Sequence, residues 1–570
     1  MASHEIHLLV YNFDNDFLDV VLDVPAKATF KSVARLFNPK WSSDRLKALK
    51  FYVPFLLILK IHVANARWVP SCEPHGIRIQ RLFPESLLDL KLMREIDKAN
   101  ELIRPRPSPS AMGSSDSDVM KAAQDDGEDD AFVTGRPFTN RGLPNTFFAS
   151  SLATLSKELK ASSITHAERQ ALVLLCRRFM DLCCAFYDSE DLRLNAVGCS
   201  LTHDIFPDDP KYKIDTPGAQ ASSGTDFRWY LSLDGQEIDY TTLKLKNQRG
   251  GGDPRMQAQT RFRDLILLKG IERRTNFPGL ILTLAASRLD IDTSIFTDRM
   301  YYEHVLTIDL EVPFCAEDHI DRFVEVVYAL RKCTQGLKQH YQTALQQSVD
   351  PIAPFLPTPT GLSAEAVSLL NNLKFVNRLD HDGGILTVTV DKCSRAGPIF
   401  LATLDGRRVL TKFVAQDKEA ARYSETAHRL LADADRAPPL HGVVPIVGGY
   451  LVVMGYAEGA HTLLYGKPAG SAKAVKDALQ RLHGAGIVFG DLREQNVLHV
   501  PATDGQLART WLIDFDWAGK AHEAVYPAMM NDRLDIWPAG VAPGAYMEIE
   551  HDRELFRRMF PEAVDLHTGW

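Results

Sequence analysis

The sequence lacks the features that define several large classes of protein. Its 8 cysteines form no C-x-x-C pair, so neither a zinc knuckle nor a disulfide framework is expected, and a reducing compartment fits them better. Lys and Arg total 65 against 73 Asp and Glu, and a net charge of -8 gives no global positive field for coating nucleic acid. No internal repeat of usable period occurs, which excludes solenoids and propellers.

Long uninterrupted apolar runs are also missing. The first residues, MASHEIHLLVYNFDNDF, carry acids where a signal peptide needs an apolar stretch, so classical secretion is not expected. The strongest apolar run, residues 51–63, contains Lys60, is too short for a bilayer and is typical of a buried strand. By sequence alone we expect a cytoplasmic or nuclear protein with no membrane partner.

The sequence does contain enough apolar material for several folded domains. At 570 residues, 45% hydrophobic and 24% charged, the chain has the size of three or four domains of ordinary composition. Two stretches rich in Pro, Ser or acidic residues interrupt the hydrophobic pattern and are typical of linkers. The predicted segments are a first block at 1–103, a disordered acidic and Pro-Ser linker at 104–145, a middle block at 146–347, a Pro-rich linker at 348–362 and a C-terminal block at 363–570.

The first block has the element order of a small β-grasp. Apolar or alternating segments predict strands at 6–11, 17–24 and 51–63, with a helix at 30–37 before the last of them. The block has no clustered nucleophile, base or metal-binding set, so we interpret it as a recognition or targeting module.

The middle block predicts a mixed sheet flanked by helices, with part of a magnesium nuclease signature. Such nucleases hold the ion with carboxylates and orient water with a lysine. Asp226 heads one predicted strand and Lys246 ends the next, while Glu190 and Gln257 are candidates from a preceding and a following helix. Lys244 stands where an acid would complete the signature, and a cation there repels magnesium.

Two interpretations of the middle block stay open. Either Glu190, Asp226, Lys246 and Gln257 form a nuclease site, or the fold is retained with a dead metal site, which the missing acid favours. A basic stretch lies on and after the predicted helix that carries Gln257. It is a hypothetical contact for the phosphates of nucleic acid, although such stretches are more often solvated. Its residues are Arg261, Arg263, Lys269, Arg273 and Arg274.

The C-terminal block carries, in order, the groups that phosphoryl transfer needs. These are a lysine for the phosphates of ATP, an acid to hold that lysine, an acid near the attacking hydroxyl and ligands for magnesium. Lys412 ends a predicted strand, and Glu425, on a helix predicted at 419–434, is its expected partner. Asp491 is the expected catalytic acid. The remaining candidates are Asn496 and Asp514 for magnesium, and Gly383, Gly384 and Met454, together with Lys412, for ATP.

These segments resemble the Crinkler-type effector proteins of fungi. GDLREQN and IDFDWAG resemble that family's protein-kinase-like domain, FYDSEDLR, GTDF and LKLKNQRGGGDPRMQAQ resemble its endonuclease-like domain, and HLLVYNF with FLDVVLDVPAKATFKSVARLF resembles, more loosely, its ubiquitin-like header. The resemblance implies a multidomain α+β chain with a ubiquitin-like β-grasp, a restriction-endonuclease-like α/β/α core of the PD-(D/E)xK type and a compact two-lobed kinase-like domain. It also implies ATP and Mg2+ as cofactors, and a secreted effector that acts in a host cell, often in its nucleus.

Three departures from conventional protein kinases bear on the function. Phe489 and Gly490 replace the His-Arg pair before Asp491, Asp516 replaces the glycine of Asp-Phe-Gly, and no G-x-G-x-x-G motif precedes Lys412. We predict an ATP- and magnesium-dependent kinase that transfers phosphate to Ser or Thr of a protein substrate, beside a degenerate nuclease-like domain. The alternatives are a non-catalytic pseudokinase and pseudonuclease that acts by binding, or a DNA-cleaving nuclease effector.

Overall fold

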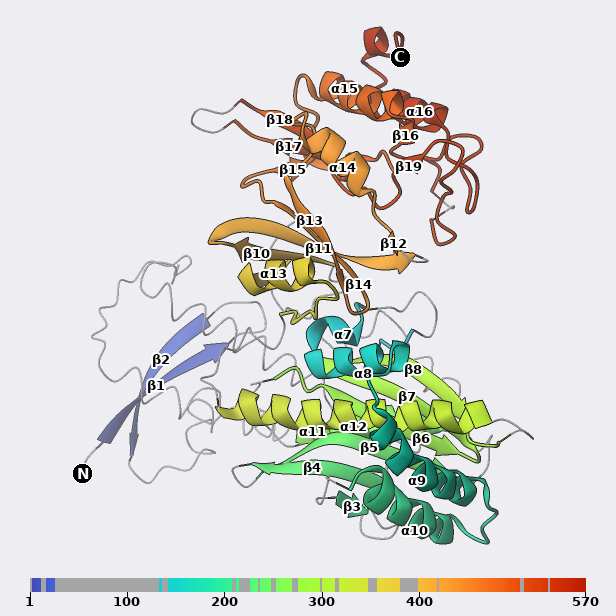
Figure 1. Cartoon of the computed structure of the whole chain (residues 1–570). Helices are drawn as coiled ribbons and strands as arrows, with labels where there is room; N and C mark the ends of the chain where they lie inside the picture. Colours follow the sequence, from blue (N-terminus) through green and yellow to red (C-terminus); the bar gives the residue numbers. More distant parts are fainter. Residues whose placement is uncertain are drawn as a thin grey trace. The chain divides into compact units, whose positions relative to one another are not determined.

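The structure is a computed structural model of the 570-residue chain, and Figure 1 shows its elements in chain order. The chain divides into two compact units, Met1–Pro84 and Glu85–Trp570, and each is described by itself. It is a mixed α/β, multidomain protein with several separate sheets. The structure describes residues 3–11, 17–25, 133–135, 142–207, 212–214, 226–233, 236–247, 253–268, 275–297, 300–312, 317–346, 356–379, 398–417, 420–502, 507–531 and 534–570.

The first unit contains the hairpin of β1 (Ser3–Tyr11) and β2 (Phe17–Pro25). The two strands are antiparallel over their whole length, from the pair Ser3 and Pro25 to the pair Tyr11 and Phe17. Both strands predicted at 6–11 and 17–24 are therefore present. The helix predicted at 30–37 and the strand predicted at 51–63 lie outside the described residues, so the β-grasp stays a prediction.

Helices with well-formed caps open the middle block. The Thr165 hydroxyl accepts from the Glu168 amide at 3.3 Å, and the Glu168 carboxylate accepts from the Thr165 amide at 2.8 Å, so two otherwise free donors are satisfied at the start of α9. Ser189 caps α10 through the Leu192 amide. The helices of this block are α7 (Asn145–Phe148), α8 (Ser150–Lys160), α9 (His166–Cys184), α10 (Glu190–Ser200), the π-helix η2 (Leu201–Ile205), α11 (Pro254–Leu268) and α12 (Glu317–Gln346).

A six-stranded mixed sheet forms the centre of the middle block, as predicted. Its strand order is β3-β4-β5-β6-β7-β8, and every neighbouring pair is antiparallel except β5 and β6. A parallel pair needs a crossover connection, which α11 provides while it packs against both strands. The strands are β3 (Tyr212–Ile214), β4 (Phe227–Leu233), β5 (Gln236–Lys246), β6 (Gly279–Ala285), β7 (Arg288–Phe296) and β8 (Met300–Asp309).

The strand β7 was not predicted from the sequence. Its segment RLDIDTSIF has too many polar residues to resemble a core strand, yet every residue after Arg288 is buried. The acidic side chains are buried because basic groups neutralise them: Asp292 accepts two hydrogen bonds from the Arg255 guanidinium, at 2.9 and 2.6 Å.

The long helix α12 covers one face of this sheet (Figure 1). Its buried residues include Phe323, Val327, Leu330 and Leu337, which recur at three- and four-residue spacing, and also Val324, Val326 and Ala329. The middle of the 30-residue helix is thus buried on several sides, where it also packs against α8 and α9. Among the described residues no helix is both long and apolar enough to cross a membrane.

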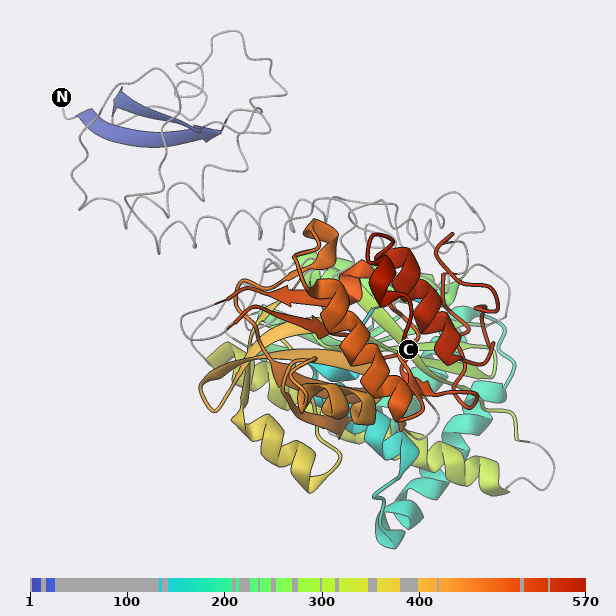
Figure 2. The same cartoon turned by 90° about the horizontal axis from the view of Figure 1, so that it is seen from above.

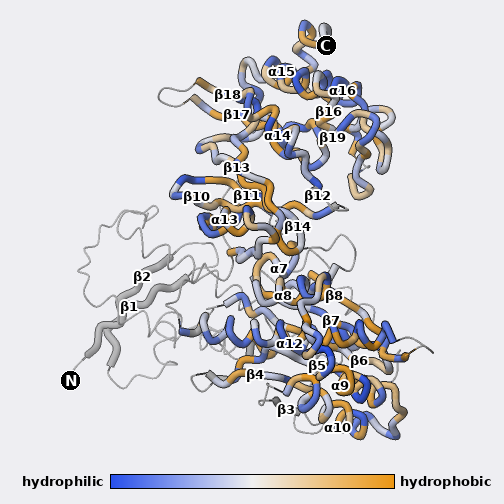
Figure 3. Tube along the Cα trace, in the orientation of Figure 1, coloured by the Kyte–Doolittle hydropathy of each residue, from blue (hydrophilic) through white to orange (hydrophobic). Residues whose placement is uncertain are grey.

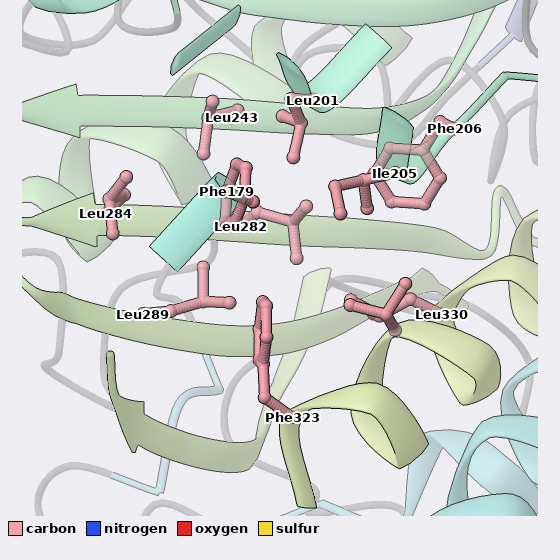
Figure 4. Close-up of a pocket in the computed structure, with 11 residues that line it drawn as sticks. Phe179, Leu201, Ile205, Phe206, Leu243, Leu282, Leu284, Leu289, Phe323 and Leu330 are labelled. Carbon is pink, nitrogen blue, oxygen red and sulfur yellow. The ribbon is translucent and has the colours of Figure 1, made fainter. Parts of the chain in front are cut away.

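A small cavity lies in the apolar core between α12 and the sheet. Figure 4 shows side chains from α9, η2, β5, β6 and α12 around it, among them Phe179, Leu243, Leu282 and Phe323. Every lining residue is apolar, so a water molecule inside would find no hydrogen-bond partner. We interpret this cavity as a gap in core packing.

The C-terminal block begins with an antiparallel sheet of strand order β13-β14-β11-β10-β9, with β12 paired to β11. The helix predicted at 419–434 is shorter, because 420–421 pair with β11 and Ser424 caps the helix through the Ala427 amide. The elements are α13 (Ala364–Asn372), β9 (Leu373–Arg378), β10 (Ile399–Leu404), β11 (Arg407–Asp417), β12 (Ala420–Ala421), α14 (Glu425–Ala432), β13 (Leu440–Ile446) and β14 (Gly449–Gly455).

The remainder of the block combines short strand pairs with two helices that contact each other, drawn in orange and dark red in Figure 2. The elements are β15 (His461–Thr462), η4 (Leu463–Tyr465), α15 (Ser471–Gly484), β16 (Ile487–Val488), η5 (Glu494–Asn496), β17 (Val497–Val500), β18 (Arg509–Leu512), β19 (Gly519–Lys520), α16 (Ile549–Met559) and η6 (Val564–Leu566).

The short helix α7 packs against the C-terminal sheet, where Figure 3 shows hydrophobic segments along β11 and β14. Phe147 is completely buried, and its ring centroid lies 6.2, 5.6 and 5.2 Å from those of Phe375, Phe400 and Phe413. Phe413 directly follows Lys412 on β11, so the sheet that carries this lysine shares a core with the middle block.

The described end of the Pro-rich linker, residues 356–362, is hydrogen-bonded on both sides. The Thr358 amide donates to the Phe147 carbonyl at 3.0 Å, and the Leu362 amide donates to the Pro445 carbonyl at 3.0 Å. This part of the linker is therefore fixed between α7 and the C-terminal sheet, and does not simply span a gap.

Replacing Phe147 by alanine should lower the free energy of unfolding by about 3–5 kcal/mol, because it removes a ring from a filled aromatic cluster. Phe186, which is fully exposed, offers the matched control, and Phe186→Ala should change stability by no more than about 0.5 kcal/mol. Urea unfolding followed by tryptophan fluorescence measures both, and equal effects of the two variants would contradict the packing described.

Candidate active site

The lysine predicted to bind phosphates lies in a cluster of opposite charges. Lys412 is 7% exposed, and its ammonium lies 2.6 Å from Asp514 Oδ1 and 2.8 Å from Asp516 Oδ1. β11 brings the lysine to the cluster, and the segment after β18 brings the two acids. Residues about a hundred positions apart in the sequence thus form one compact ionic group.

Backbone strain occurs at Asp514, where the cluster is built. Its φ of 67° lies in the left-handed region, which is uncommon for a residue with a Cβ and is retained mainly where the surrounding structure fixes the geometry. The neighbouring Ile513 amide donates to the Asn496 carbonyl at 3.0 Å, which ties this segment to the loop that carries Asp491.

The ionisation of the cluster follows from burial and charge. Burial alone would lower the pKa of Lys412, but the attraction of Asp514 and then Asp516 outweighs it and raises that pKa above its usual value. Burial would raise the pKa of Asp514, but Lys412 outweighs it, and the pKa of Asp514 is lowered. Burial also raises the pKa of Asp516. Lys412 lowers that pKa and the negative charge of Asp514 raises it further, so the net shift is upward.

Asp491 lies in the loop between β16 and β17 and is 3% exposed. Its carboxylate accepts two hydrogen bonds from the Arg493 guanidinium, at 2.5 and 2.6 Å, and one from Asn496 Nδ2 at 2.9 Å. Burial raises the pKa of Asp491, while Arg493 opposes that rise. The guanidinium of Arg493 also lies 5.8 Å from the ring centroid of Trp537.

The orientation of Asn496 fits a metal ligand. Its amide nitrogen is committed to Asp491, with bonds of 2.9 Å to the carbonyl and to Oδ2, so its side-chain oxygen is the atom left for a cation. Magnesium bound to a nucleotide takes only one or two protein carboxylates or amides, and the phosphates supply further oxygens. Asn496 and Asp514 would hold the ion here, and Lys412 would contact the phosphates.

The buried Asp552 was not predicted, although it anchors the Asp491 loop. It is completely buried in the first turn of α16, and its carboxylate accepts from the amides of Phe489 at 2.7 Å and Gly490 at 2.9 Å. His483 lies 3.0 Å from the same group. A lone acid far along the chain carries no spacing signal, so sequence reasoning missed it.

The predicted ion pair between Lys412 and Glu425 does not form. Glu425 is the first residue of α14, its side chain is 43% exposed, and it bonds Arg429 one turn later at 2.7 Å. The buried face of the helix carries Ala427, His428 and Leu431, and Glu425, three residues before His428, lies at the edge of that face. The thirteen-residue spacing from Lys412 indicated a helix, but not which face it turns inward.

The candidates for ATP contacts have different outcomes. Gly383 and Gly384 lie outside the described residues. Met454 is 8% exposed near the end of β14, opposite Leu410 of β11, and the next residue, Gly455, donates its amide to the Pro439 carbonyl at 2.8 Å. Met454 is therefore on a strand next to the one that carries Lys412.

Phe515, between the two acids, is held by an aromatic group. It stacks on His428 with a centroid distance of 4.7 Å, and its carbonyl accepts from the Ser424 amide at 3.0 Å. Burial lowers the pKa of His428 to about 4, so the imidazole is neutral. Nε2 then donates to the Pro438 carbonyl, and Nδ1 accepts from the Tyr423 hydroxyl.

In the middle block, Lys244 stands where the nuclease signature would need an acid, and its ion pair with Asp226 closes the candidate site. Its ammonium lies 2.9 Å from Asp226 Oδ1, and Asp226 Oδ2 accepts from the Leu245 amide at 2.6 Å. Both oxygens of the carboxylate are thus taken by protein donors. Lys246 lies 3.7 Å from Glu190, so each of the two lysines has its own acid.

The other middle-block candidates add no metal ligand to this group. Gln257 is 8% exposed in the first turn of α11, and Arg263 is buried and bonds Asp264 at 2.9 Å. Lys269, Arg273 and Arg274 lie outside the described residues. Across the described ranges, no three His, Cys, Asp or Glu side chains are grouped so that they could hold a metal by themselves.

Lys244→Glu should create a magnesium site from two carboxylates that repel each other without metal. We expect a variant that is less stable than the wild type in the absence of Mg2+ and regains its melting temperature when Mg2+ is added. Lys244→Gln, which removes the charge without adding an acid, is the control and should not respond to Mg2+. If the two variants respond alike, the closed-site interpretation is wrong; if Lys244→Glu also cleaves DNA, the wild-type site is a decayed nuclease.

Acid should destabilise the C-terminal block through His428. The unfolded histidine has its ordinary pKa of 6.5 and the folded one about 4, so the unfolded state binds the proton first and stability falls as the pH drops below 6.5. At pH 5 the loss from this residue is about 2 kcal/mol. Urea unfolding at pH 7 and pH 5 should show a smaller drop in His428→Gln than in the wild type, and equal drops would contradict the assignment.

Comparisons with known proteins add little to this geometry. No protein-family model matches the sequence, and no curated protein matches it. A structural match is the kinase PK-1 of Cydia pomonella granulovirus, at 17% sequence identity and a TM-score of 0.25, covering 35% of this chain and 70% of that one.

Proposed function

We propose that the C-terminal block, residues 363–570, is an ATP- and magnesium-dependent phosphotransferase that acts on Ser or Thr hydroxyls of proteins. The proposal rests on four side chains that the fold brings close together. Lys412 contacts Asp514 at 2.6 Å, Asn496 contacts Asp491 at 2.9 Å, and the Ile513 amide joins the two pairs through the Asn496 carbonyl at 3.0 Å. Phosphoryl transfer depends mainly on positioning and charge, and these are the groups that it uses.

The roles follow from the chemistry of each side chain. A substrate hydroxyl attacks the γ-phosphorus of ATP, the bond to the bridging oxygen breaks, and ADP leaves. The hydroxyl proton passes to Asp491, whose raised pKa makes the carboxylate a better acceptor. Arg493 holds that carboxylate in place with two hydrogen bonds. When bound, Mg2+ neutralises the phosphate charge that develops in the transition state.

The remaining assignments rest on the resemblance to Crinkler-type effectors. The first block would be the ubiquitin-like header that directs delivery, and the protein would be secreted and act in a host cell, in its nucleus. The middle block would be a PD-(D/E)xK nuclease-like domain that has lost its metal site. The ion pair between Lys244 and Asp226 supports that loss, because it takes the position of a metal.

Transfer of labelled γ-phosphate from ATP to a generic protein substrate tests the catalytic proposal. Asp491→Asn should lower transfer by about 100-fold or more, the usual contribution of a general base. Asp565→Asn replaces an exposed acid and should leave transfer unchanged. No transfer by a wild type that still binds ATP would favour the alternative, a non-catalytic pseudokinase that acts as a binding protein.

A further inference from the structure

The partner of Lys412 is the unusual feature of the candidate active site. A buried ammonium is costly unless a carboxylate neutralises it, and one that binds phosphates also needs a fixed direction. Glu425, expected in that role, has a half-exposed side chain and is bonded to Arg429 at 2.7 Å. The acids in contact with the Lys412 ammonium are Asp514 at 2.6 Å and Asp516 at 2.8 Å.

Helix α14 is held in a position that keeps Glu425 away. The Ser424 amide just before the helix donates to the Phe515 carbonyl at 3.0 Å, and His428 stacks on the Phe515 ring. The inward position of the helix is therefore filled by His428, and a neutral imidazole cannot neutralise a lysine. Turning the helix to bring Glu425 into that position would move the His428 ring off Phe515.

With magnesium bound beside Asn496, Asp514 would divide its two carboxylate oxygens between the metal and Lys412. Asp516 would keep its carboxylate for the ammonium alone. Asp516 is 2.8 Å from the ammonium already, and it stands where conventional kinases have a glycine with no side chain.

We infer that Asp516 is the positioning residue for Lys412, in place of an acid from the helix. On the proposed phosphotransferase function, the carboxylate that positions Lys412 and the one that would hold magnesium then lie in one segment of three residues, 514–516. The ATP-binding groups then assemble without any movement of α14. A kinase of this design does not use that helix as an activity switch.

The following segment is rigid enough for Asp516 to act in this way. Trp517 stacks on Trp537 with a centroid distance of 5.5 Å and lies edge-on to Tyr526 at 6.0 Å. The Ala518 amide donates to the Phe515 carbonyl at 3.3 Å, closing a turn around Asp516. Contacts on both sides therefore fix the backbone of this aspartate.

Steady-state kinetics of three variants of the full chain test the inference. Asp516→Asn should raise the KM for ATP by about tenfold, the scale of one lost charge-assisted contact, with a smaller change in kcat. Asp516→Glu, which keeps the carboxylate, should recover part of that loss, and Glu425→Gln should stay near the wild type. The Mg2+ concentration for half-maximal rate should not move in Asp516→Asn; if it does, Asp516 is a metal ligand and the inference is overturned.

A second measurement does not require activity or ATP. Acetic anhydride acylates free amines, and mass spectrometry reports how fast the Lys412 peptide is modified. Loss of a neutralising carboxylate frees the amine, so acylation of Lys412 should be several-fold faster in Asp516→Asn than in the wild type or Glu425→Gln. The inference is wrong if Glu425→Gln gives the larger increase, or if neither variant differs from the wild type. If acylation responds as expected but the wild type transfers no phosphate, the proposed function fails and the assignment of Asp516 stands.

Discussion

The ionic contact between one lysine and two aspartates organises the C-terminal block. Lys412 joins the antiparallel sheet to the segment 514–516, and burial makes each charge depend on the others. Two carboxylates face one ammonium, and burial together with the charge of Asp514 raises the pKa of Asp516. In the proposed function, this cluster would hold a magnesium ion and, through it, the phosphates of a nucleotide.

The middle block shows the opposite balance with similar residues. There Lys244 meets Asp226 alone, and the second oxygen of that carboxylate is bonded to the Leu245 amide. One ammonium against one acid leaves no negative charge for a metal. The two clusters thus differ by one further carboxylate, which Asp516 supplies in the C-terminal block.

Sequence patterns predicted the residues that lie within a motif and missed those that act across the fold. Lys412, Asp491 and Asn496 stand at the ends of predicted elements, so their order already indicated their proximity. The predicted ion pair between Lys412 and Glu425 was wrong because spacing along the chain does not determine which helical face is buried. Asp552 and the buried polar strand β7 could not be recognised, since their acids are satisfied by groups distant in sequence.

Calorimetric titration of the full chain with ATP, with and without Mg2+, tests the central claim most directly. We expect one ATP site per chain, binding that strengthens when Mg2+ is present, and loss of that binding in Lys412→Met. Absence of ATP binding by the wild type, or binding that survives in Lys412→Met, would contradict the assignment of this cluster as a nucleotide site.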